Sequence, residues 1–526
     1  MPQEMYTRKA SGLVKSISGR TALMYNLVFL GYAWPLIYIL YGPALFPGVN
    51  MPLTVLFAAP IALAMSISYY FFTVSMPRSG GDFVWVSRSI SPLIGFIESF
   101  VFAMIMAQFT AVLGGWVPSP SLQSIVINWG TVTNNPALIN QINSFLTSTN
   151  LFILTVVVVL AACVVNLFSM NTIRTVQWIC FGIGIFGILV FIGVMLAAGH
   201  TGFVTRFNAI SGASYNGVIQ TATSSGYVLG FTVSGIVLGS VYAFQNFAGW
   251  QYPGFLGGEI KQANRAQALA IFGGIIFLTI ANFVVYEVAY GIAGSNFMNA
   301  LAYITAIGKN PLPMPTPYLG YLVSFATTNP ILAILPSIGF LAASFGVVIA
   351  IVLLLTRVFF AWSFDRILPT RISEVDDRFH APRNALFVVL GISLIFCYLY
   401  YFTPILDYLT YGSLGLWGPQ IVVGLAAMVF PYKRKNIFEQ APKFVQRRVG
   451  PIPLMTIVGL VTLVGSVFNT IIAILPVYTG APINPVYILA FVITVAVAPV
   501  IYAISYYHNR TIGIDMRLAF QELPPA

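Results

Sequence analysis

Long apolar runs dominate the chain, and short polar segments separate them. A helix needs about 20 mostly apolar residues to cross the hydrocarbon of a bilayer. Twelve segments reach that length, at residues 21–46, 51–75, 92–117, 151–168, 173–198, 227–257, 266–294, 330–362, 384–402, 410–431, 453–475 and 485–507. Barrel strands would give shorter segments of alternating pattern, so the runs predict an all-α membrane protein with twelve transmembrane helices.

The amino-acid composition excludes a water-soluble fold. Of the 526 residues, 58% are hydrophobic and only 7% are charged, whereas soluble domains carry about 25% charged residues. The net charge of +11 does not indicate a nucleic-acid partner, because basic residues beside membrane spans serve to orient them. The cysteines Cys163, Cys180 and Cys397 lie within apolar runs. Their spacing fits neither a disulfide framework nor a zinc site, and no cofactor is expected.

The basic residues alternate between the two sides that twelve spans define. Twenty-two of the 24 lie before the first span, or in or beside the connections after spans 2, 4, 6, 8, 10 and 12, and the other two are Arg206 and Lys309. Because basic residues collect on the cytoplasmic side, we expect both termini to be cytoplasmic in a multi-pass protein of the cell membrane. The polar start at 1–20 leads directly into a span, so no cleavable signal peptide is expected.

Spans 1 and 6 share a pattern that favours broken helices. Span 1 contains Gly31-Tyr32-Ala33-Trp34-Pro35, and span 6 contains Gly249-Trp250-Gln251-Tyr252-Pro253. Glycine is permissive and proline removes an amide donor, so each pentapeptide predicts an unwound stretch. The alternative is a chance match, since both residue types are common in membrane helices.

The two breaks are five spans apart, which predicts an internal repeat within one domain, 1–526. Repeat 1 would cover about 21–198 and repeat 2 about 227–431, with helices 11 and 12 at about 453–507. Five is an odd number, so the second repeat is inverted relative to the first and the breaks meet near the bilayer midplane. Unwound helix ends offer N–H groups to an anion and carbonyls to a cation, which suits an amino acid zwitterion.

Three segments resemble the amino acid-polyamine-organocation superfamily of transporters. The first runs from Met76 to Arg88 and reads Met-Pro-Arg-Ser-Gly-Gly-Asp-Phe-Val-Trp-Val-Ser-Arg. The second is Gly249-Trp250, followed by Glu259-Ile260-Lys261 and Arg265, and the third runs from Thr356 to Pro369, with Pro382 after it. The resemblance implies a leucine-transporter-like fold, with a five-plus-five inverted repeat, discontinuous helices 1 and 6 and two additional C-terminal helices. It also implies transport of amino acids or related amines by alternating access.

The resemblance also implies where the substrate binds. The family holds the substrate carboxylate on the span-1 break, here Gly31, Tyr32 and Ala33, and the ammonium on span-1 and span-6 carbonyls, here around Phe244 to Ala248. With the nearby aromatic and amide side chains added, the candidate substrate-binding residues are Gly31, Tyr32, Ala33, Trp34, Gln108, Phe244, Gln245, Asn246, Phe247, Ala248, Gly249 and Trp250. Ordinary packing and helix–helix hydrogen bonding are the alternative roles for the side chains in this set.

Acidic residues within the spans are the candidates for ion coupling. Glu98 in span 3 and Glu287 in span 7 either carry a coupling proton or are hydrated or partnered acids near an interface. Proton-coupled relatives carry a lysine in span 5, where the matching position here is Gly184. Neither that lysine nor the span-8 hydroxyl pair of sodium-coupled relatives is evident.

The sequence thus predicts a secondary active transporter and not an enzyme, since no cluster of nucleophile, base or metal ligands occurs. The breaks carry no fixed charge, which favours neutral amino acids, with a proton or a sodium ion as coupling ion and membrane lipid as the surroundings. The alternatives are an amino acid exchanger, a carrier of another amine or a nucleobase, and a sensor with the transporter fold. The oligomeric state is left open.

Overall fold

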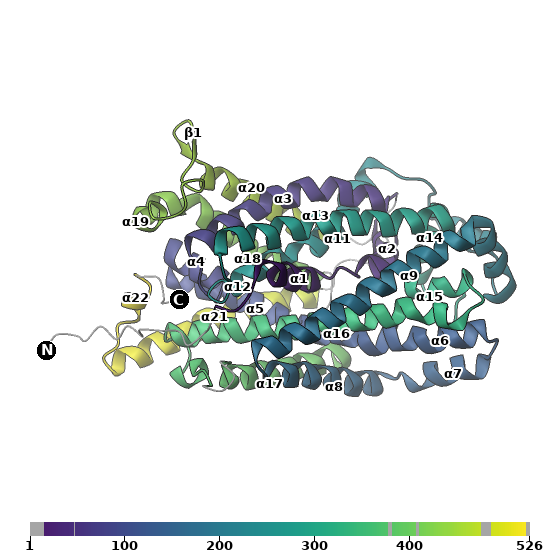
Figure 1. Cartoon of the computed structure of the whole chain (residues 1–526), viewed down its shortest axis with the longest axis horizontal. Helices are drawn as coiled ribbons and strands as arrows, with labels where there is room; N and C mark the ends of the chain where they lie inside the picture. Colours follow the sequence, from purple (N-terminus) through teal and green to yellow (C-terminus); the bar gives the residue numbers. More distant parts are fainter. Residues whose placement is uncertain (1–14, 47, 377–380, 407–409, 475–484, 522–526) are drawn as a thin grey trace.

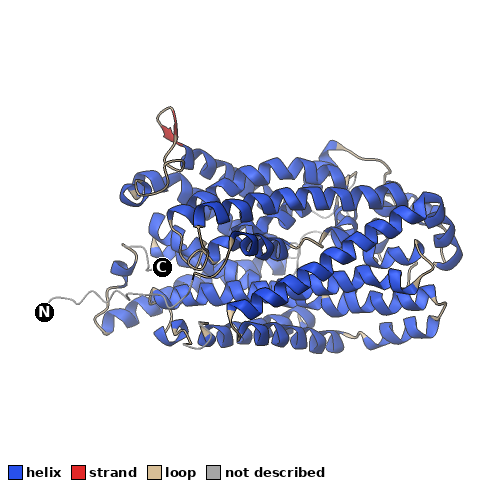
Figure 2. Ribbon diagram, in the orientation of Figure 1, coloured by secondary structure: helices blue, strands red, loops and turns tan. Residues whose placement is uncertain are grey.

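The protein is a bundle of helices that run along one common direction (Figure 1). The computed structural model describes residues 15–46, 48–376, 381–406, 410–474 and 485–521. Nearly all of this is helix (Figure 2), and the described strands are one antiparallel pair, β1 (Arg448–Val449) and β2 (Ile452–Pro453).

Eleven helical segments in the described part of the chain are long and apolar enough to cross a membrane. One consists of α1 (Gly19–Leu30) and α2 (Pro35–Leu45) together. The others are built on α3 (Met51–Ser75), α5 (Pro92–Gly115), α8 (Ser148–Asn166), α9 (Met170–Ile210), α13 (Ala263–Ala289), α16 (Pro330–Phe364), α17 (Arg383–Phe402), α18 (Thr410–Lys433), α20 (Leu454–Ala473) and α21 (Pro485–Thr511).

The expected sixth span, 227–257, is the one of the twelve that is not among these eleven segments. The chain forms α11 (Val233–Phe247), a 3-10 turn η2 (Ala248–Gln251) and the short α12 (Tyr252–Phe255). Each of these pieces is shorter than 18 residues. The interruption falls on the glycine- and proline-containing pentapeptide, because Pro253 has no amide hydrogen to continue the helix.

The first span is interrupted at the matching place. Gly31 has φ +72° and ψ +65°, a left-handed conformation that ends α1, and α2 begins at Pro35. Left-handed geometry costs a residue with a Cβ about 1–2 kcal/mol, so glycine is the residue suited to this position. The chain from Gly31 to Trp34 forms a turn between the two helices.

The three long connections after the predicted spans 3, 5 and 7, on the side opposite most basic residues, are themselves largely helical. They contain η1 (Val117–Leu122), α6 (Gln123–Val132), α7 (Pro136–Phe145), α10 (Tyr215–Ser224), η3 (Tyr290–Gly294), α14 (Ser295–Ala306), α15 (Leu319–Leu322) and η4 (Val323–Phe325). Their polar residues serve as helix N-caps: Asn135 accepts a hydrogen bond from the amide of Leu138, and Thr147 from that of Asn150. Polar composition here marks helix ends more than irregular loops.

The remaining short elements lie at the opposite end of the bundle. They are α4 (Asp82–Ser89), η5 (Thr370–Ser373), α19 (Lys435–Phe438) and α22 (Met516–Ala519). Figure 1 shows α4, α19, α22 and β1 at the left end, and α7, α14 and α15 at the right end. The left end therefore carries segments that the charge pattern assigns to the basic, cytoplasmic side.

Helices α1, α2 and α16 occupy the interior of the bundle. The most apolar window of α1–α2 is 94% buried and that of α21 only 6% buried. A helix that is apolar all round is either enclosed by protein or faces lipid. The broken first span is thus enclosed by other helices, whereas α21 presents most of its surface outward.

Candidate functional site

The two helix breaks contact each other through Asn246. Its side-chain amide donates to the backbone carbonyls of Leu30, at 2.5 Å, and of Gly31, at 3.1 Å. In a continuous helix the Gly31 carbonyl would accept from the amide of residue 35, but Pro35 has no hydrogen to donate. The Trp34 amide donates to this carbonyl instead, at 2.9 Å, and Asn246 adds a second donor. Asn246 also binds the Leu30 carbonyl, so a side chain from one break binds the unwound backbone of the other.

A second asparagine holds Asn246 in this orientation. Asn282 on α13 donates from its amide to Asn246 Oδ1 at 2.5 Å, and the exposed fractions of both residues are 1%. Gly249 brings the backbones together: an ideal Cβ built there would lie 3.2 Å from the Leu30 Cα and 2.8 Å from the Phe29 ring. The spacing leaves no room for a larger residue than glycine at 249.

A cavity of about 40 Å³ lies between the breaks. It is lined by Phe29, Leu30, Trp34, Tyr38, Met106, Phe109, Leu113, Gln245, Asn246, Ala248, Gly249, Val347, Ile351 and Leu416. Trp34, Gln245, Asn246, Ala248 and Gly249 are five of the twelve candidate substrate-binding residues. The volume is small beside the roughly 300–1,000 Å³ typical of ligand pockets, so the breaks are closely packed in this conformation.

The other seven candidates lie around this cavity without lining it. Tyr32 points to α9, where its hydroxyl donates to the carbonyls of Cys180, at 3.1 Å, and Phe181, at 3.4 Å. Gly31, Ala33, Gln108, Phe244, Phe247 and Trp250 are buried residues that do not line it. For the aromatic members of this group, packing is the role that the geometry displays.

Two kinds of unused polar group remain at the breaks. Within the described chain, the backbone N–H groups of Tyr32 and Ala33, just before α2, have no acceptor in hydrogen-bonding geometry. Gln245 has an 8% exposed side chain whose amide nitrogen and oxygen also lack a partner among those residues. A buried amide without a hydrogen-bond partner lowers the stability of the folded protein, and the Gln245 amide borders the cavity. These groups could bind a carboxylate and an ammonium without any fixed charge.

Apolar residues account for the part of the lining that sequence reasoning missed. Met106, Phe109 and Leu113 follow one face of α5, and Val347 and Ile351 follow one face of α16. Their helical spacing was a usable signal. However, both helices are apolar on every face, so nothing in the sequence distinguishes the face that meets the cavity.

An aromatic cluster covers one side of the cavity, towards the end that carries η1. The Trp34 ring packs edge-on against Trp116 at 4.7 Å between centroids and against Phe340 at 5.8 Å. Trp116 also stacks on Phe340. Trp34 rests directly over Gly31, where any Cβ would overlap the indole. Movement of Trp34 would therefore open the cavity on this side.

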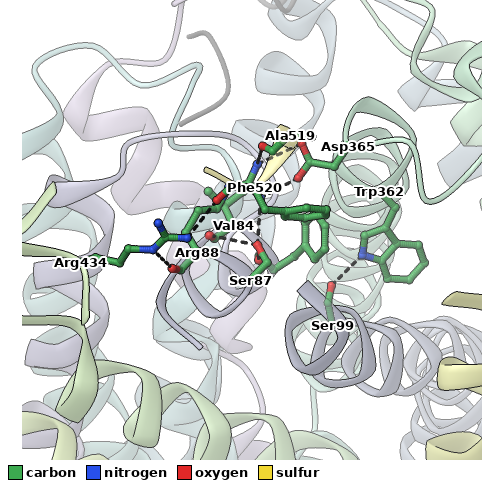
Figure 3. A network of polar contacts seen from close by, with 10 residues as sticks. Val84, Ser87, Arg88, Ser99, Trp362, Asp365, Arg434, Ala519 and Phe520 are labelled. Atoms are coloured by element: carbon green, nitrogen blue, oxygen red, sulfur yellow. Dashed lines mark hydrogen bonds and ion pairs between the residues drawn. The ribbon is translucent and has the colours of Figure 1, made fainter. Parts of the chain in front are cut away.

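Buried ion pairs hold the opposite, basic end together. Arg88 on α4 binds Asp365 at the end of α16, with nitrogen–oxygen distances of 2.6 and 3.0 Å (Figure 3). Arg357 binds Glu259 at 2.8 and 3.0 Å. Burial raises the pKa of Asp365, and the adjacent Arg88 guanidinium partly offsets that increase. The paired residues belong to the three family-like segments, and they join the ends of spans 2, 6 and 8.

The C-terminal segment closes over the Arg88 pair. Arg88 donates to the carbonyl of Ala519, and its guanidinium lies 4.9 Å from the Phe520 ring centroid. Arg434 donates to the carbonyls of Arg88 and Phe520 (Figure 3). Residues far apart in the sequence thus form one polar network.

The two glutamates expected inside the membrane have different surroundings. Glu98 on α5 is 3% exposed, and neither carboxylate oxygen has a hydrogen-bond partner among the described residues. Glu287 on α13 is exposed. Gly184, at the position where some relatives carry a lysine, lies against the Tyr32 hydroxyl. Of the two acids, only Glu98 belongs to the protein interior.

Comparison with known proteins identifies the family. The sequence matches the amino acid permease family over residues 18–498. It is also similar to a protein of Sulfolobus islandicus rod-shaped virus 1 that is named uncharacterized protein 399, with 27% identity over 84 residues. That match covers 16% of this chain and 21% of the viral protein, so it carries no argument about function. The family match spans the breaks, the cavity and both ion pairs. This multi-pass membrane protein belongs to the amino acid permease family.

Proposed function

We propose that the protein is a secondary active transporter of neutral amino acids that works by alternating access and couples transport to protons. The observation that carries this proposal is the composition of the cavity between the breaks. None of its 14 lining residues is charged, and its polar groups are the Gln245 and Asn246 amides, the Tyr38 hydroxyl, the Trp34 indole N–H and the backbone. A substrate with a net charge would leave that charge without a partner, at a cost of several kcal/mol.

A zwitterion fits the same groups. The unused N–H groups of Tyr32 and Ala33 precede α2, where the helix dipole favours an anion such as a carboxylate. The Gln245 side-chain oxygen and nearby carbonyls can accept from an ammonium. The apolar faces of α5 and α16 would surround the substrate side chain.

The proposed architecture is the five-plus-five inverted repeat, with repeats at about 21–198 and 227–431, two further helices and cytoplasmic termini. The interruptions at Gly31 and at η2 are five spans apart, which supports this arrangement. In alternating access the cavity opens to one side at a time, by separation of either the Trp34 cluster or the ion-paired end.

The test is counterflow in proteoliposomes loaded with one unlabelled amino acid, with labelled leucine, alanine or serine outside. We expect these three to compete for uptake, and arginine and glutamate to compete weakly. Gln245→Ala should lower the initial rate, whereas Gln446→Ala, a matched glutamine near β1, should not. Competition by arginine or glutamate alone would contradict a neutral substrate.

The same experiment separates the alternatives. Gradient-driven uptake without internal amino acid identifies net transport, whereas uptake only in loaded vesicles identifies an exchanger. Binding without counterflow would identify a sensor.

A further inference from the structure

Two carboxylates that no charged group neutralises lie beside the span-6 break. Asp82 begins α4 and is 1% exposed, and Glu98 on α5 is 3% exposed. All four of their carboxylate oxygens lack a hydrogen-bond partner among the described residues. Buried charges are otherwise paired or hydrogen-bonded in proteins. The rest of this end follows that rule, as the Arg88–Asp365 and Arg357–Glu259 pairs show.

The two carboxylates belong to one helical hairpin. Only Ile90 and Ser91 separate α4 from α5, and the helices touch where Gly95 meets Ser87: an ideal Cβ at Gly95 would lie 2.6 Å from the Ser87 amide. Asp82 lies N-terminal to Ser87 on α4, and Glu98 lies C-terminal to Gly95 on α5. The two acids are close enough to interact electrostatically.

A buried tyrosine hydroxyl is the third polar group of the cluster. Tyr69 on α3 is 0% exposed, its Oη has no partner in the described chain, and it interacts electrostatically with both Asp82 and Glu98. A hydroxyl can donate to one carboxylate oxygen and accept from a protonated carboxyl. Asp82, Glu98 and Tyr69 do not hydrogen-bond to one another in this conformation but interact electrostatically, so they form a cluster in which a proton can reside on one of the two carboxyl groups.

The charged and titratable groups around the cluster have other partners or are neutral. On the elements packed on α3, α4 and α5, such groups at this end include Arg88, Arg357, Asp365, Lys433, Arg434, Tyr252 and Tyr502. Arg88 and Asp365 bind each other, Lys433 donates to the Ile90 carbonyl, and Arg434 donates to the Arg88 and Phe520 carbonyls. None of them hydrogen-bonds to Asp82 or Glu98.

We propose that Asp82 and Glu98, with the Tyr69 hydroxyl, form the proton-binding site of the transport cycle. With both acids ionised, two negative charges would lie buried without a cation, so the stable form carries one proton on the pair. In each cycle one proton enters the pair from one side and leaves to the other. Burial raises the pKa of Asp82 to about 8, although its own backbone amide opposes the increase. This proposal rests on the proposed function and names the site of its coupling.

Contacts with span 6 explain how the proton would affect the substrate site. The Tyr69 ring lies 6.2 Å from that of Trp250 in η2. Phe102, one turn after Glu98, stacks on Phe255 of α12 at 5.2 Å. Gly81, beside Asp82, also lies against the Phe255 ring. A second charge on the pair would draw in water or a cation and disturb these contacts at the break.

The experiment measures the proton flux that alanine drives, relative to the amino acid exchange activity of the same protein. Purified protein in liposomes holds a pH-sensitive dye, and labelled alanine is added without a pH gradient. A separate counterflow assay measures how much of each variant is active. The proton flux of that variant is then divided by this amount. We expect wild-type protein to move protons with alanine, and Asp82→Asn and Glu98→Gln to lose this flux. Glu287→Gln, the matched exposed glutamate, should keep the wild-type ratio.

Tyr69→Phe gives a second test that removes only one oxygen. It should shift the pH dependence of alanine-driven proton flux even if one of the carboxylate variants fails to fold. A wild-type ratio of proton flux to counterflow in Asp82→Asn and Glu98→Gln would overturn the proposal. Alanine-driven sodium uptake that wild-type protein shows and both variants lose would overturn it as well. Counterflow without proton movement in wild-type protein would overturn this site but leave the transport function standing. Absence of counterflow for every amino acid would instead refute the proposed function.

Discussion

Adding one methyl group at Gly184 tests whether the position of Tyr32 sets the geometry of the first break. An ideal Cβ at Gly184 would overlap the Tyr32 hydroxyl oxygen and lie 2.7 Å from its Cζ, whereas ordinary contact begins near 3.4 Å. Gly184→Ala must therefore displace the ring, with loss of its bonds to Cys180 and Phe181. Tyr32 adjoins Gly31 in the turn, so the displacement reaches the backbone that would hold the substrate carboxylate.

Overpacking of a buried site costs about 1–3 kcal/mol. If that cost falls on one conformation of the cycle, the equilibrium between conformations changes by about 5- to 150-fold. We expect Gly184→Ala to lower the initial rate of counterflow by a factor within that range. Gly182→Ala is the matched control on the same helix, because no atom lies within 4 Å of its ideal Cβ.

A double-mutant cycle makes the result specific to Tyr32. In Tyr32→Phe the overlapping oxygen is gone and the nearest atom is Cζ at 2.7 Å, so a shift of the ring by about 0.7 Å restores ordinary contact. Combined with Gly184→Ala, it should recover part of the lost rate. A wild-type rate in Gly184→Ala, or equal losses in Gly184→Ala and Gly182→Ala, would refute the reasoning.

Three further changes test the buried polar contacts. Asn246→Leu leaves the Leu30 carbonyl and the Asn282 amide without their hydrogen-bond partner, whereas the Gly31 carbonyl keeps its bond from the Trp34 amide. Thermal unfolding in detergent should therefore show a loss of about 1–3 kcal/mol for each of the two unpaired groups; an unchanged midpoint would contradict this. Arg88→Met strands the buried Asp365 carboxylate and should cost about 3–5 kcal/mol, most of which Asp365→Leu should recover in the double variant. The pKa of Asp82 is raised from 3.8 to about 8 in the folded protein. The folded state therefore holds a proton that the unfolded state loses, and the free energy of unfolding falls as pH rises through this interval and levels off above it. Asp82→Asn should flatten that decline in melting scans from about pH 5 to about pH 9. If the stability of both proteins changed equally with pH, the raised pKa of Asp82 would be ruled out.

The sequence was sufficient to predict where helices run and where two of them break. Hydropathy marks the spans because apolar length is a local property of the chain. The interruptions at Gly31 and η2 follow from glycine and proline, whose effects are also local. Hydropathy alone could not show that the sixth predicted span divides into α11, η2 and α12.

The partners of the buried polar groups could not be predicted in the same way. Asn246 was a candidate for substrate binding, and the structure shows that it also satisfies the carbonyls of the other break. That contact joins residues more than 200 positions apart, and no local pattern reports it. Likewise, Asp82 lies in a family-like segment, and only the packing of α4 against α5 shows that it faces Glu98.

The Asn246 side chain has a mechanical consequence. It connects two discontinuous helices by hydrogen bonds of 2.5 and 3.1 Å, which tolerate much less stretching than apolar packing does. A displacement of one break would therefore be passed to the other through this side chain. In the proposed transport cycle, a ligand attached at one break would reposition both helices.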